Sequence, residues 1–335
     1  MTRQQVSLEH GEGGELSHKL LGEVFVSRFG HAEESKWDAA RLAVPEGRIA
    51  LTTDTFTLQP LFVNGCNIGK LAVAGTVNDL TVSGAVPRYL TAGFVIEEGF
   101  PVRDLMTIVD AMAAEAQKSG VRIVAGDTKI IKRGTIGGVI INTAGVGVIP
   151  PEFDLHPEAM QEGDAVIVSG PIGDHAVAVL AARGELGVMT DLPSDCTSLY
   201  SMIREVRERG AEVRFMRDPT RGGLATTLVE IAEDFGAVIE IEQEVIPIRP
   251  EVEGVCELLG YDPLYFASEG RAVLIVAESD APRVLHVLRE TEEGKEAAVI
   301  GRVVGRGEGK VLLKSALGSR RRVLRLQGMQ LPRIC

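Results

Sequence analysis

Residues 89–125 read YLTAGFVIEEGFPVRDLMTIVDAMAAEAQKSGVRIVA, and this stretch decides the fold class. Its apolar pattern predicts a strand at 89–97, a helix at 102–119 and a second strand at 121–125. A strand, a helix and a strand in succession are typical of α/β architecture. The stretch therefore predicts a mixed α/β domain.

The sequence on either side continues the same alternation. Upstream, 16–29 has a helical pattern, and 48–53 predicts a strand that ends on Asp54. A helix is expected at 70–83, where small side chains permit close backbone packing. Downstream, 137–148 predicts a further strand.

A break at Ile149, Pro150 and Pro151 separates this domain from a second one. After the break the pattern restarts with a strand at 164–169 and a helix at 175–183, and further helices and strands follow to residue 277. We expect two α/β domains in series, divided as a Gly-rich segment and helix at 1–45, an N-terminal domain at 46–150, a C-terminal domain at 151–318 and a mobile tail at 319–335.

Composition narrows the class of protein. The chain has 335 residues of which 45% are hydrophobic, enough for two domain-sized cores. A net charge of −12 argues against a nucleic-acid surface, which needs clustered Lys and Arg. No apolar run reaches the roughly 18 residues of a membrane helix, and the N-terminus lacks a signal-peptide pattern. Four cysteines without a C-x-x-C pair fit a reducing compartment, so we expect a soluble, cytoplasmic protein.

Three aspartates follow apolar stretches or lie beside small residues: Asp54, Asp79 and Asp127. Carboxylates at strand ends converge on one edge of a sheet. Oxygen ligands of this kind suit Mg²⁺, which usually joins one or two carboxylates to substrate phosphates. Each aspartate taken alone can also be a turn residue or a helix cap.

Glycine-rich segments provide the second signal. Residues 218–223 read DPTRGG and precede an apolar-periodic helix. Free N–H groups at a helix start, two glycines and Arg221 make a plausible phosphate cradle. Neither a P-loop nor a Rossmann glycine motif is present. Any nucleotide must therefore be held in another way, and dispersed aspartates with glycine loops are one such solution.

The chain ends on a cysteine, Cys335. A thiolate is nucleophilic, and a residue at an untethered terminus can visit more than one site. If Leu326 is the last anchored residue, the nine residues after it reach roughly 30 Å when extended. Cys335 is then a candidate carrier of a covalently bound group. The alternative is a cysteine without function at a frayed end.

The candidate residues fall in short segments: HGEGG at 10–14, TDT at 53–55, NDL at 78–80, GDTK at 126–129, GDH at 173–175, DPTRGG at 218–223 and the terminal PRIC. In this combination they resemble the HypE family of hydrogenase maturation factors. The resemblance runs from about residue 8 to the end. Its frame is shared with aminoimidazole ribonucleotide synthetase, selenophosphate synthetase and thiamine-monophosphate kinase, whereas the terminal PRIC is specific.

The resemblance implies a two-domain PurM-like fold whose N-terminal mixed-sheet domain binds ATP and pairs through its sheet in a homodimer. It also implies an ATP-dependent carbamoyl dehydratase that makes the cyanide ligand of [NiFe] hydrogenases. In this family a HypF-type carbamoyltransferase loads a carbamoyl group on the terminal thiol, here Cys335. ATP-dependent dehydration leaves a thiocyanate, and the cyano group passes to a HypC–HypD scaffold. No nucleic-acid or membrane partner is implied.

The family's functional positions carry over one by one. Asp54, Asp79 and Asp127 match positions that bind metal and ATP phosphates, and Gly11, Gly13 and Gly14 match a mobile loop over the phosphates. The nucleotide site is completed by the positions that match Asn78, Asp218, Thr220, Arg221, Gly222 and Gly223. Lys129 and Glu269 match the catalytic pair that removes the amide protons. Lys129 can instead be a phosphate contact, and Glu269 a surface ion-pair partner of Arg271.

Two other functions stay open. One is a related ATP-dependent enzyme, of the selenophosphate synthetase or thiamine-monophosphate kinase type. Against the first, the chain has no cysteine before Cys66, and the terminal PRIC has no purpose in either. The other is a non-catalytic maturation adaptor that uses its tail only to dock a partner.

Overall fold

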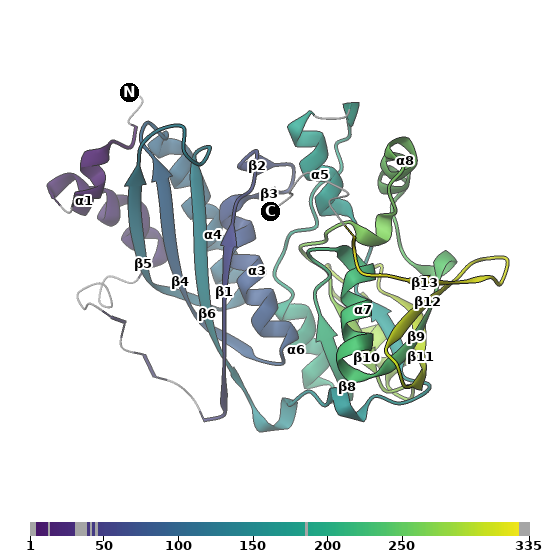
Figure 1. Ribbon diagram of the computed structural model, residues 1–335. Coiled ribbons are helices and arrows are strands. Elements are labelled where there is room, and N and C mark those ends of the chain that lie inside the picture. The colour runs from purple at the N-terminus through teal and green to yellow at the C-terminus, as the bar shows by residue number, and fades with distance from the viewer. Residues whose placement is uncertain are drawn as a thin grey trace.

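The computed structural model describes residues 5–12, 14–30, 39–40, 42–43, 46–184 and 187–327. They form two α/β units side by side, with α3 between the sheet of the first unit and the second unit (Figure 1). The first unit consists of η1 (Leu8–Gly11), α1 (Glu15–Leu20), the π-helical η2 (Leu21–Val26), α2 (Ser27–Phe29), β1 (Arg48–Phe56), β2 (Phe62–Val63), β3 (Cys66–Asn67), α3 (Ile68–Val82), β4 (Val86–Glu97), α4 (Val102–Ser119), β5 (Arg122–Ile131) and β6 (Val139–Ile149).

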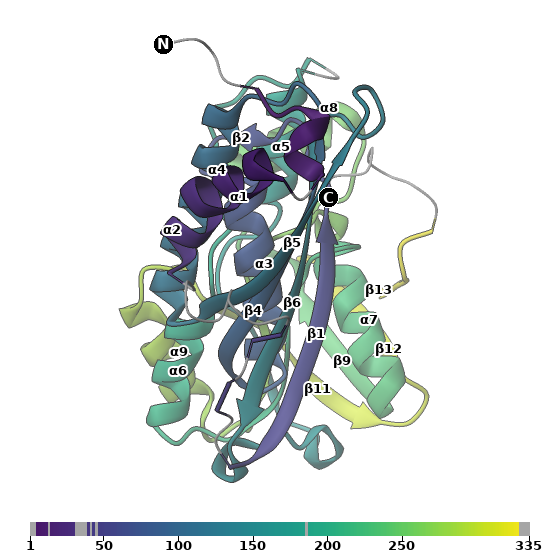
Figure 2. The same ribbon diagram turned by 90° about the vertical axis from the view of Figure 1, so that its left-hand side faces the viewer.

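A four-stranded sheet in the order β1-β6-β4-β5 is the centre of the first unit. Helices α3 and α4 cover its inner face, and Figure 2 shows α2 beside α4. Helix α4 buries Leu105, Ile108, Met112 and neighbouring apolar residues at helical spacing, and it ends where Gly120 adopts a left-handed conformation. The helix has the bounds that the sequence predicts.

Helix α3 is buried on almost every side. A Cβ atom at Gly69 would lie 2.2 Å from the Ile108 carbonyl oxygen, and one at Gly75 would lie 2.9 Å from the Phe56 ring. The close packing expected of its small residues is confirmed. Helix α3 is thereby held against both α4 and β1.

The outer face of the sheet is open. On β1 the side chains of Ile49 and Leu51 are 61% and 74% exposed, whereas Asp54 shares the opposite, inner face with Phe56. Side chains alternate between faces along a strand. Large apolar side chains on an open sheet face are characteristic of a surface that another molecule covers.

The second unit is built on a seven-stranded sheet in the order β13-β12-β9-β11-β7-β10-β8. Helix α7 packs on one face of the sheet and α6 and α9 pack on the other. The elements after β6 are η4 (Pro151–Phe153), η5 (Pro157–Ala159), β7 (Ala165–Val168), α5 (Asp174–Arg183), α6 (Tyr200–Glu208), β8 (Val213–Arg217), α7 (Gly223–Phe235), β9 (Ala237–Glu242), η7 (Gln243–Val245), α8 (Pro250–Leu259), η8 (Pro263–Tyr265), β10 (Val273–Val276), α9 (Ala281–Glu290), β11 (Ala298–Arg306), β12 (Lys310–Lys314) and β13 (Arg320–Val323).

Two expected boundaries are wrong. Strand β5 continues to Ile131 instead of ending at Ala125, because its backbone pairs with β4 along that length. The segment expected to be mobile from residue 319 contains a strand, since Arg320–Val323 pairs with β12 as the edge strand of the second sheet.

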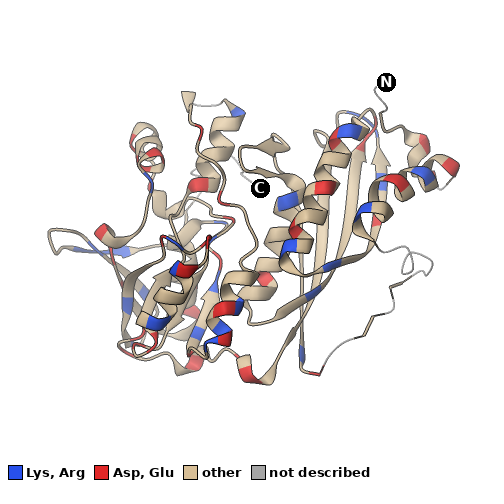
Figure 3. Cartoon of the chain, turned by 180° about the vertical axis from the view of Figure 1, so that it is seen from behind, with Lys and Arg blue, Asp and Glu red and all other residues tan. Residues whose placement is uncertain are grey.

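Acidic and basic residues alternate over both units in the view of Figure 3. Within the described residues, no helix has both the length and the apolar character to cross a membrane.

Candidate active site

A pocket of about 140 Å³ lies between the two units. The first unit contributes Asp54 from β1 and Asp79 from α3, and the second contributes Asp218, Arg221 and Glu269. The remaining lining residues are Thr53, Thr55, Phe56, Gly75 and Thr220. Six of the residues that the sequence singles out therefore lie around one pocket.

Asp54 and Asp79 approach from neighbouring elements because α3 packs against the inner face of β1. The Thr52 hydroxyl donates a 2.8 Å hydrogen bond to Asp79 Oδ2, and the Thr55 amide donates one of 3.0 Å to Asp54 Oδ1. Burial raises the pKa of Asp79, the Thr52 hydrogen bond opposes that rise, and the Asp54 carboxylate adds to it.

Asp218 follows β8 and faces the same two carboxylates. Burial, and then the charge of Asp79, raise its pKa to about 7. Three carboxylates that repel one another in this way form a donor set that a divalent cation would stabilise. Among the residues that the structure describes, no group of three or more His, Cys, Asp or Glu is arranged to hold a metal ion by itself. Ligands from a phosphate would be needed to complete such a site.

The turn between β8 and α7 forms the opposite wall. Gly222 and Gly223 have φ angles of 80° and 62°, and a Cβ atom at Gly223 would lie 2.5 Å from the Leu264 carbonyl oxygen. Glycine is required at such positions. Helix α7 starts at Gly223, so Arg221, which lines the pocket, lies just before the N-terminus of the helix. This arrangement suits a phosphate group.

The last described residues run along this helix. Arg325 pairs with Glu233 at 2.7 Å, and the Leu326 amide donates a 3.2 Å hydrogen bond to the Thr226 hydroxyl, in the first turn of α7. Leu326 is thus anchored, next to the Gly222 turn. Cys335 lies outside the described residues.

Asn78 does not line the pocket, although the sequence suggests a nucleotide contact. It is buried, and its amide nitrogen donates to the carbonyl oxygens of Thr197 (3.0 Å) and Glu269 (3.3 Å). Its amide oxygen accepts a 2.8 Å hydrogen bond from Leu199 N–H. Asn78 therefore clamps the second unit onto α3.

Asp127 and Lys129 lie elsewhere in the chain. They pair with Gly93 and Val95 of β4, and both are exposed on the outer face of the sheet. Asp54 is on the inner face of β1, three strands away. The expected convergence of Asp54, Asp79 and Asp127 at one edge is wrong within a single chain, because strand order and side-chain alternation separate them.

The Gly-rich segment lies with the second group. A Cβ atom at Gly11 would lie 3.1 Å from Ile130 of β5, and Gly14 precedes α1. Gly13 lies outside the described residues. One chain thus holds two separate groups of predicted site residues, one at the pocket and one beside β5.

Glu269 lines the pocket and is only 6% exposed. It is not at the surface, and Arg271 lies near two other carboxylates, Asp174 at 3.7 Å and Asp195 at 3.6 Å. The Glu269 amide donates a 3.1 Å hydrogen bond to Asp195 Oδ1. Asp195 carries no sequence signal, since it lies in an irregular segment outside every recognised motif.

The comparisons with known proteins place this geometry in a family. Residues 36–149 match the family described as AIR synthase related protein, N-terminal domain, and residues 161–314 match AIR synthase related protein, C-terminal domain. Carbamoyl dehydratase HypE of Rhodobacter capsulatus is 46% identical over 335 residues, which cover 99% of this chain and 98% of the relative.

Two solved structures extend the likeness to the fold. The crystal structure of the hydrogenase maturation protein HypE in complex with ATP has a TM-score of 0.92 and 40% identity, and the match covers 98% of this chain and 99% of the other. The crystal structure of a HypE–HypF complex has a chain with a TM-score of 0.79 and 42% identity, covering 93% of this chain and all of that one.

Proposed function

The chain belongs to the HypE family of carbamoyl dehydratases, and from that premise we propose that it converts an S-carbamoyl group on Cys335 to a thiocyanate at the pocket between its two units. It is an ATP-dependent enzyme of hydrogenase maturation. Its family resemblance, predicted from the sequence, is confirmed at full length, so the alternatives of a selenophosphate synthetase, a thiamine-monophosphate kinase or an adaptor are set aside.

The anchor of the tail is the observation that carries the proposal. Leu326 is bound to Thr226 in the first turn of α7, the helix that follows the turn with Thr220 and Arg221 of the pocket. The nine residues from there to Cys335 reach at most about 32 Å at about 3.6 Å each. That length allows the thiol to enter the pocket of its own chain and to be presented to a partner.

The reaction starts at the carbamoyl oxygen, which is a poor leaving group until it is phosphorylated. That oxygen attacks the γ-phosphorus of ATP, and ADP leaves. Both N–H protons are then removed, the C–O bond breaks with release of phosphate, and a C≡N bond remains on sulfur. One thiocarbamate and one ATP thus give one thiocyanate, ADP and phosphate.

The carboxylates of Asp54, Asp79 and Asp218 are assigned to the triphosphate end of ATP, with Arg221 as a phosphate donor and the Gly222–Gly223 turn as the backbone beside it. Mg²⁺ fits this donor set, and when bound it would neutralise charge between the carboxylates and the phosphates. Thr220 lies on the same wall. Asn78 acts indirectly, by holding the segments around Glu269 and Thr197.

We assign Asp127, Lys129 and the Gly11–Gly14 segment to the site of a second copy in a homodimer. The pocket of one chain, about 140 Å³, is below the roughly 300–1,000 Å³ of a usual small-molecule site. Because β1 is an edge strand, Asp54 can be approached around that edge by a partner seated on the open sheet face with Ile49 and Leu51. Asp127 of the partner would add the third predicted carboxylate.

Glu269 is assigned as the base that removes an amide proton. Its position supports this, since Glu269 lines the pocket and is only 6% exposed, so that a substrate held in the pocket would lie beside it. Lys129, presented by the second copy, is either its catalytic partner or a phosphate contact.

A HypF-type carbamoyltransferase is proposed as the carbamoyl donor, and a related HypE has been solved in complex with HypF. The cyano group is proposed to pass to a HypC–HypD scaffold, with all of these steps in the cytoplasm.

Intact mass is the decisive measurement. After incubation with the carbamoyltransferase, carbamoyl phosphate and ATP, the protein should gain one carbamoyl group and then lose one water, both on Cys335. Cys335→Ser should remain unmodified. A modification on any other residue would refute the assignment.

A further inference from the structure

Both main-chain polar groups of Glu269 form hydrogen bonds with side chains. Its N–H donates to Asp195 Oδ1 at 3.1 Å, and its carbonyl oxygen accepts from Asn78 of α3 at 3.3 Å. The next residue, Gly270, lies so close to Asp195 that a Cβ atom would be 1.9 Å from the Asp195 carbonyl oxygen. One hydrogen bond thus comes from each unit of the fold.

Asp195 is a buried charge. Its side chain is fully buried, and its Oδ2 lies 3.6 Å from Arg271 Nε. Within the described part of the chain this Oδ2 has no hydrogen-bond partner. Desolvating such a pair costs several kcal/mol, and apolar residues of similar volume often stabilise a fold at least as well. A contribution to stability therefore does not explain why a carboxylate, and not an apolar side chain, occupies position 195.

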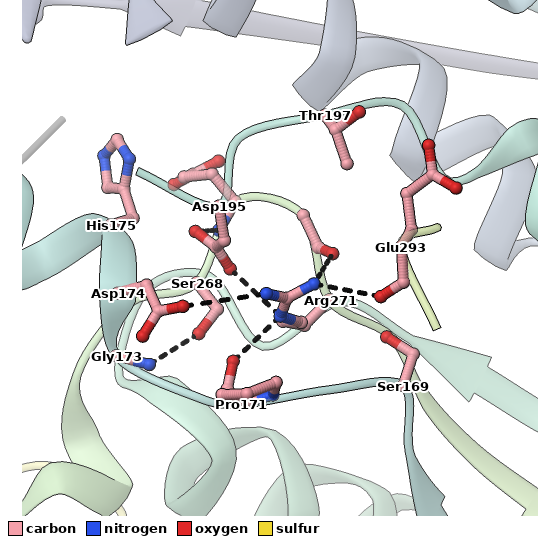
Figure 4. A network of polar contacts seen from close by, with 12 residues as sticks. Ser169, Pro171, Gly173, Asp174, His175, Asp195, Thr197, Ser268, Arg271 and Glu293 are labelled. Atoms are coloured by element: carbon pink, nitrogen blue, oxygen red, sulfur yellow. Dashed lines mark hydrogen bonds and ion pairs between the residues drawn. The ribbon is translucent and has the colours of Figure 1, made fainter. Parts of the chain in front are cut away.

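Asp174 provides an internal comparison. It is the second carboxylate beside Arg271, at 3.7 Å from Nη2 (Figure 4). It also pairs with Arg249 at 3.0 Å. It is almost as buried as Asp195, but its hydrogen bond goes to Arg249 and not to Glu269. The two aspartates share a charge environment and differ in their contact with the segment that carries Glu269.

We propose that Asp195 is a positioning residue for the dehydration: its Oδ1 fixes the Glu269 amide so that the Glu269 side chain faces the pocket. This inference rests on the proposed role of Glu269 as the base. Arg271 balances the charge that the acceptor needs, and its own bonds to the carbonyl oxygens of Pro171 (2.8 Å) and Glu293 (3.2 Å) fix it in place.

The test distinguishes the effect of the hydrogen bond between Glu269 and Asp195 from the effect of the negative charge on Asp195. Asp195→Asn keeps an acceptor for the Glu269 amide and removes the charge, whereas Asp195→Ala removes both. Asp174→Asn and Asp174→Ala are the matched controls. Each variant is loaded with carbamoyl on Cys335, and kcat for thiocyanate formation and KM for ATP are measured separately.

Asp195→Ala should lower kcat by about 10- to 100-fold, the usual effect of losing a supporting contact, and leave the KM for ATP within about twofold. Asp195→Asn and both Asp174 variants should stay within about threefold of the parent kcat. If Asp195→Ala does not fold, Asp195→Leu fills the same volume without an acceptor and takes its place.

Three results would overturn the inference: an unchanged kcat in Asp195→Ala or Asp195→Leu, a loss of kcat in Asp195→Asn as large as in Asp195→Ala, or an equal loss in the Asp174 variants. Glu269→Gln tells this failure from a failure of the proposed base. If Glu269→Gln is fully active, the base assignment is wrong. If it is inactive while Asp195→Ala or Asp195→Leu is fully active, only the positioning role is wrong.

Discussion

Two inactive variants should restore each other if the reaction site is shared between two copies. Asp79 lies at the pocket, and Asp127 lies on the outer sheet face, about 14 Å from β1 across three strand spacings of about 4.8 Å. We expect Asp79→Asn and Asp127→Asn each to abolish thiocyanate formation as homodimers. In a heterodimer of the two, one site carries both substitutions and the other carries neither.

The heterodimer, purified with a different tag on each copy, should therefore recover about half of the parent activity per dimer, and a random mixture about one quarter. The control is a heterodimer with Asp79→Asn in one copy and Asp218→Asn in the other. Both residues line the pocket of a single chain, so each of its two sites carries one substitution and neither is intact. An inactive Asp79→Asn/Asp127→Asn heterodimer of normal mass would refute the shared site, and so would recovery in the control.

Two further predictions concern stability. Gly69→Ala forces a Cβ atom against the Ile108 carbonyl oxygen and should lower the free energy of unfolding by more than about 3 kcal/mol. Gly254→Ala in α8 meets no atom within 4 Å and should raise the free energy of unfolding by up to about 1 kcal/mol. Equal denaturant midpoints for the two variants would contradict this prediction. Burial lowers the pKa of His175 to about 4, so its contribution, present above pH 6.5, is lost as pH falls toward 4, by roughly 3 kcal/mol. Burial raises the pKa of Asp174 to about 6, so its contribution to stability is present below pH 4 and lost as pH rises through 6. Between pH 6 and pH 4 the contributions of His175 and Asp174 therefore nearly cancel, and the free energy of unfolding of the parent should change little. His175→Asn should become more stable as pH falls from 6 to 4, and equal changes in parent and variant between pH 6 and 4.5 would contradict the two pKa shifts.

The sequence predicts those features that depend on local spacing. Helix α4 has its expected bounds because Pro101 precedes it and Gly120 ends it. Asp54 and Asp79 meet as expected, since each follows or lies within a strongly patterned element, and Asp218, whose place in the site is implied by the family resemblance, joins them. Asp127 does not join them because β5 continues past Ala125, where the sequence predicts its end, and only the pairing of β5 with β4 shows which face the Asp127 side chain occupies.

Local sequence patterns do not predict contacts between residues that are far apart in the chain. The hydrogen bonds of Asn78 span 119 and 191 residues, and that of Asp195 with Glu269 spans 74. No spacing rule relates residues so far apart. The same holds for the anchor of Leu326 on Thr226, where the contact depends on how the second sheet brings its last strand past α7.

The adjacency of Asn78 and Asp79 has a mechanical consequence. Successive residues of one rigid helix hold the carboxylate pocket and the segment with Glu269, so a hinge motion between the units cannot separate them without breaking the three hydrogen bonds of Asn78. At about 0.5–1.5 kcal/mol each, those bonds would resist opening by about 1.5–4.5 kcal/mol. The residues that each chain contributes to the pocket are therefore preorganised before any nucleotide arrives.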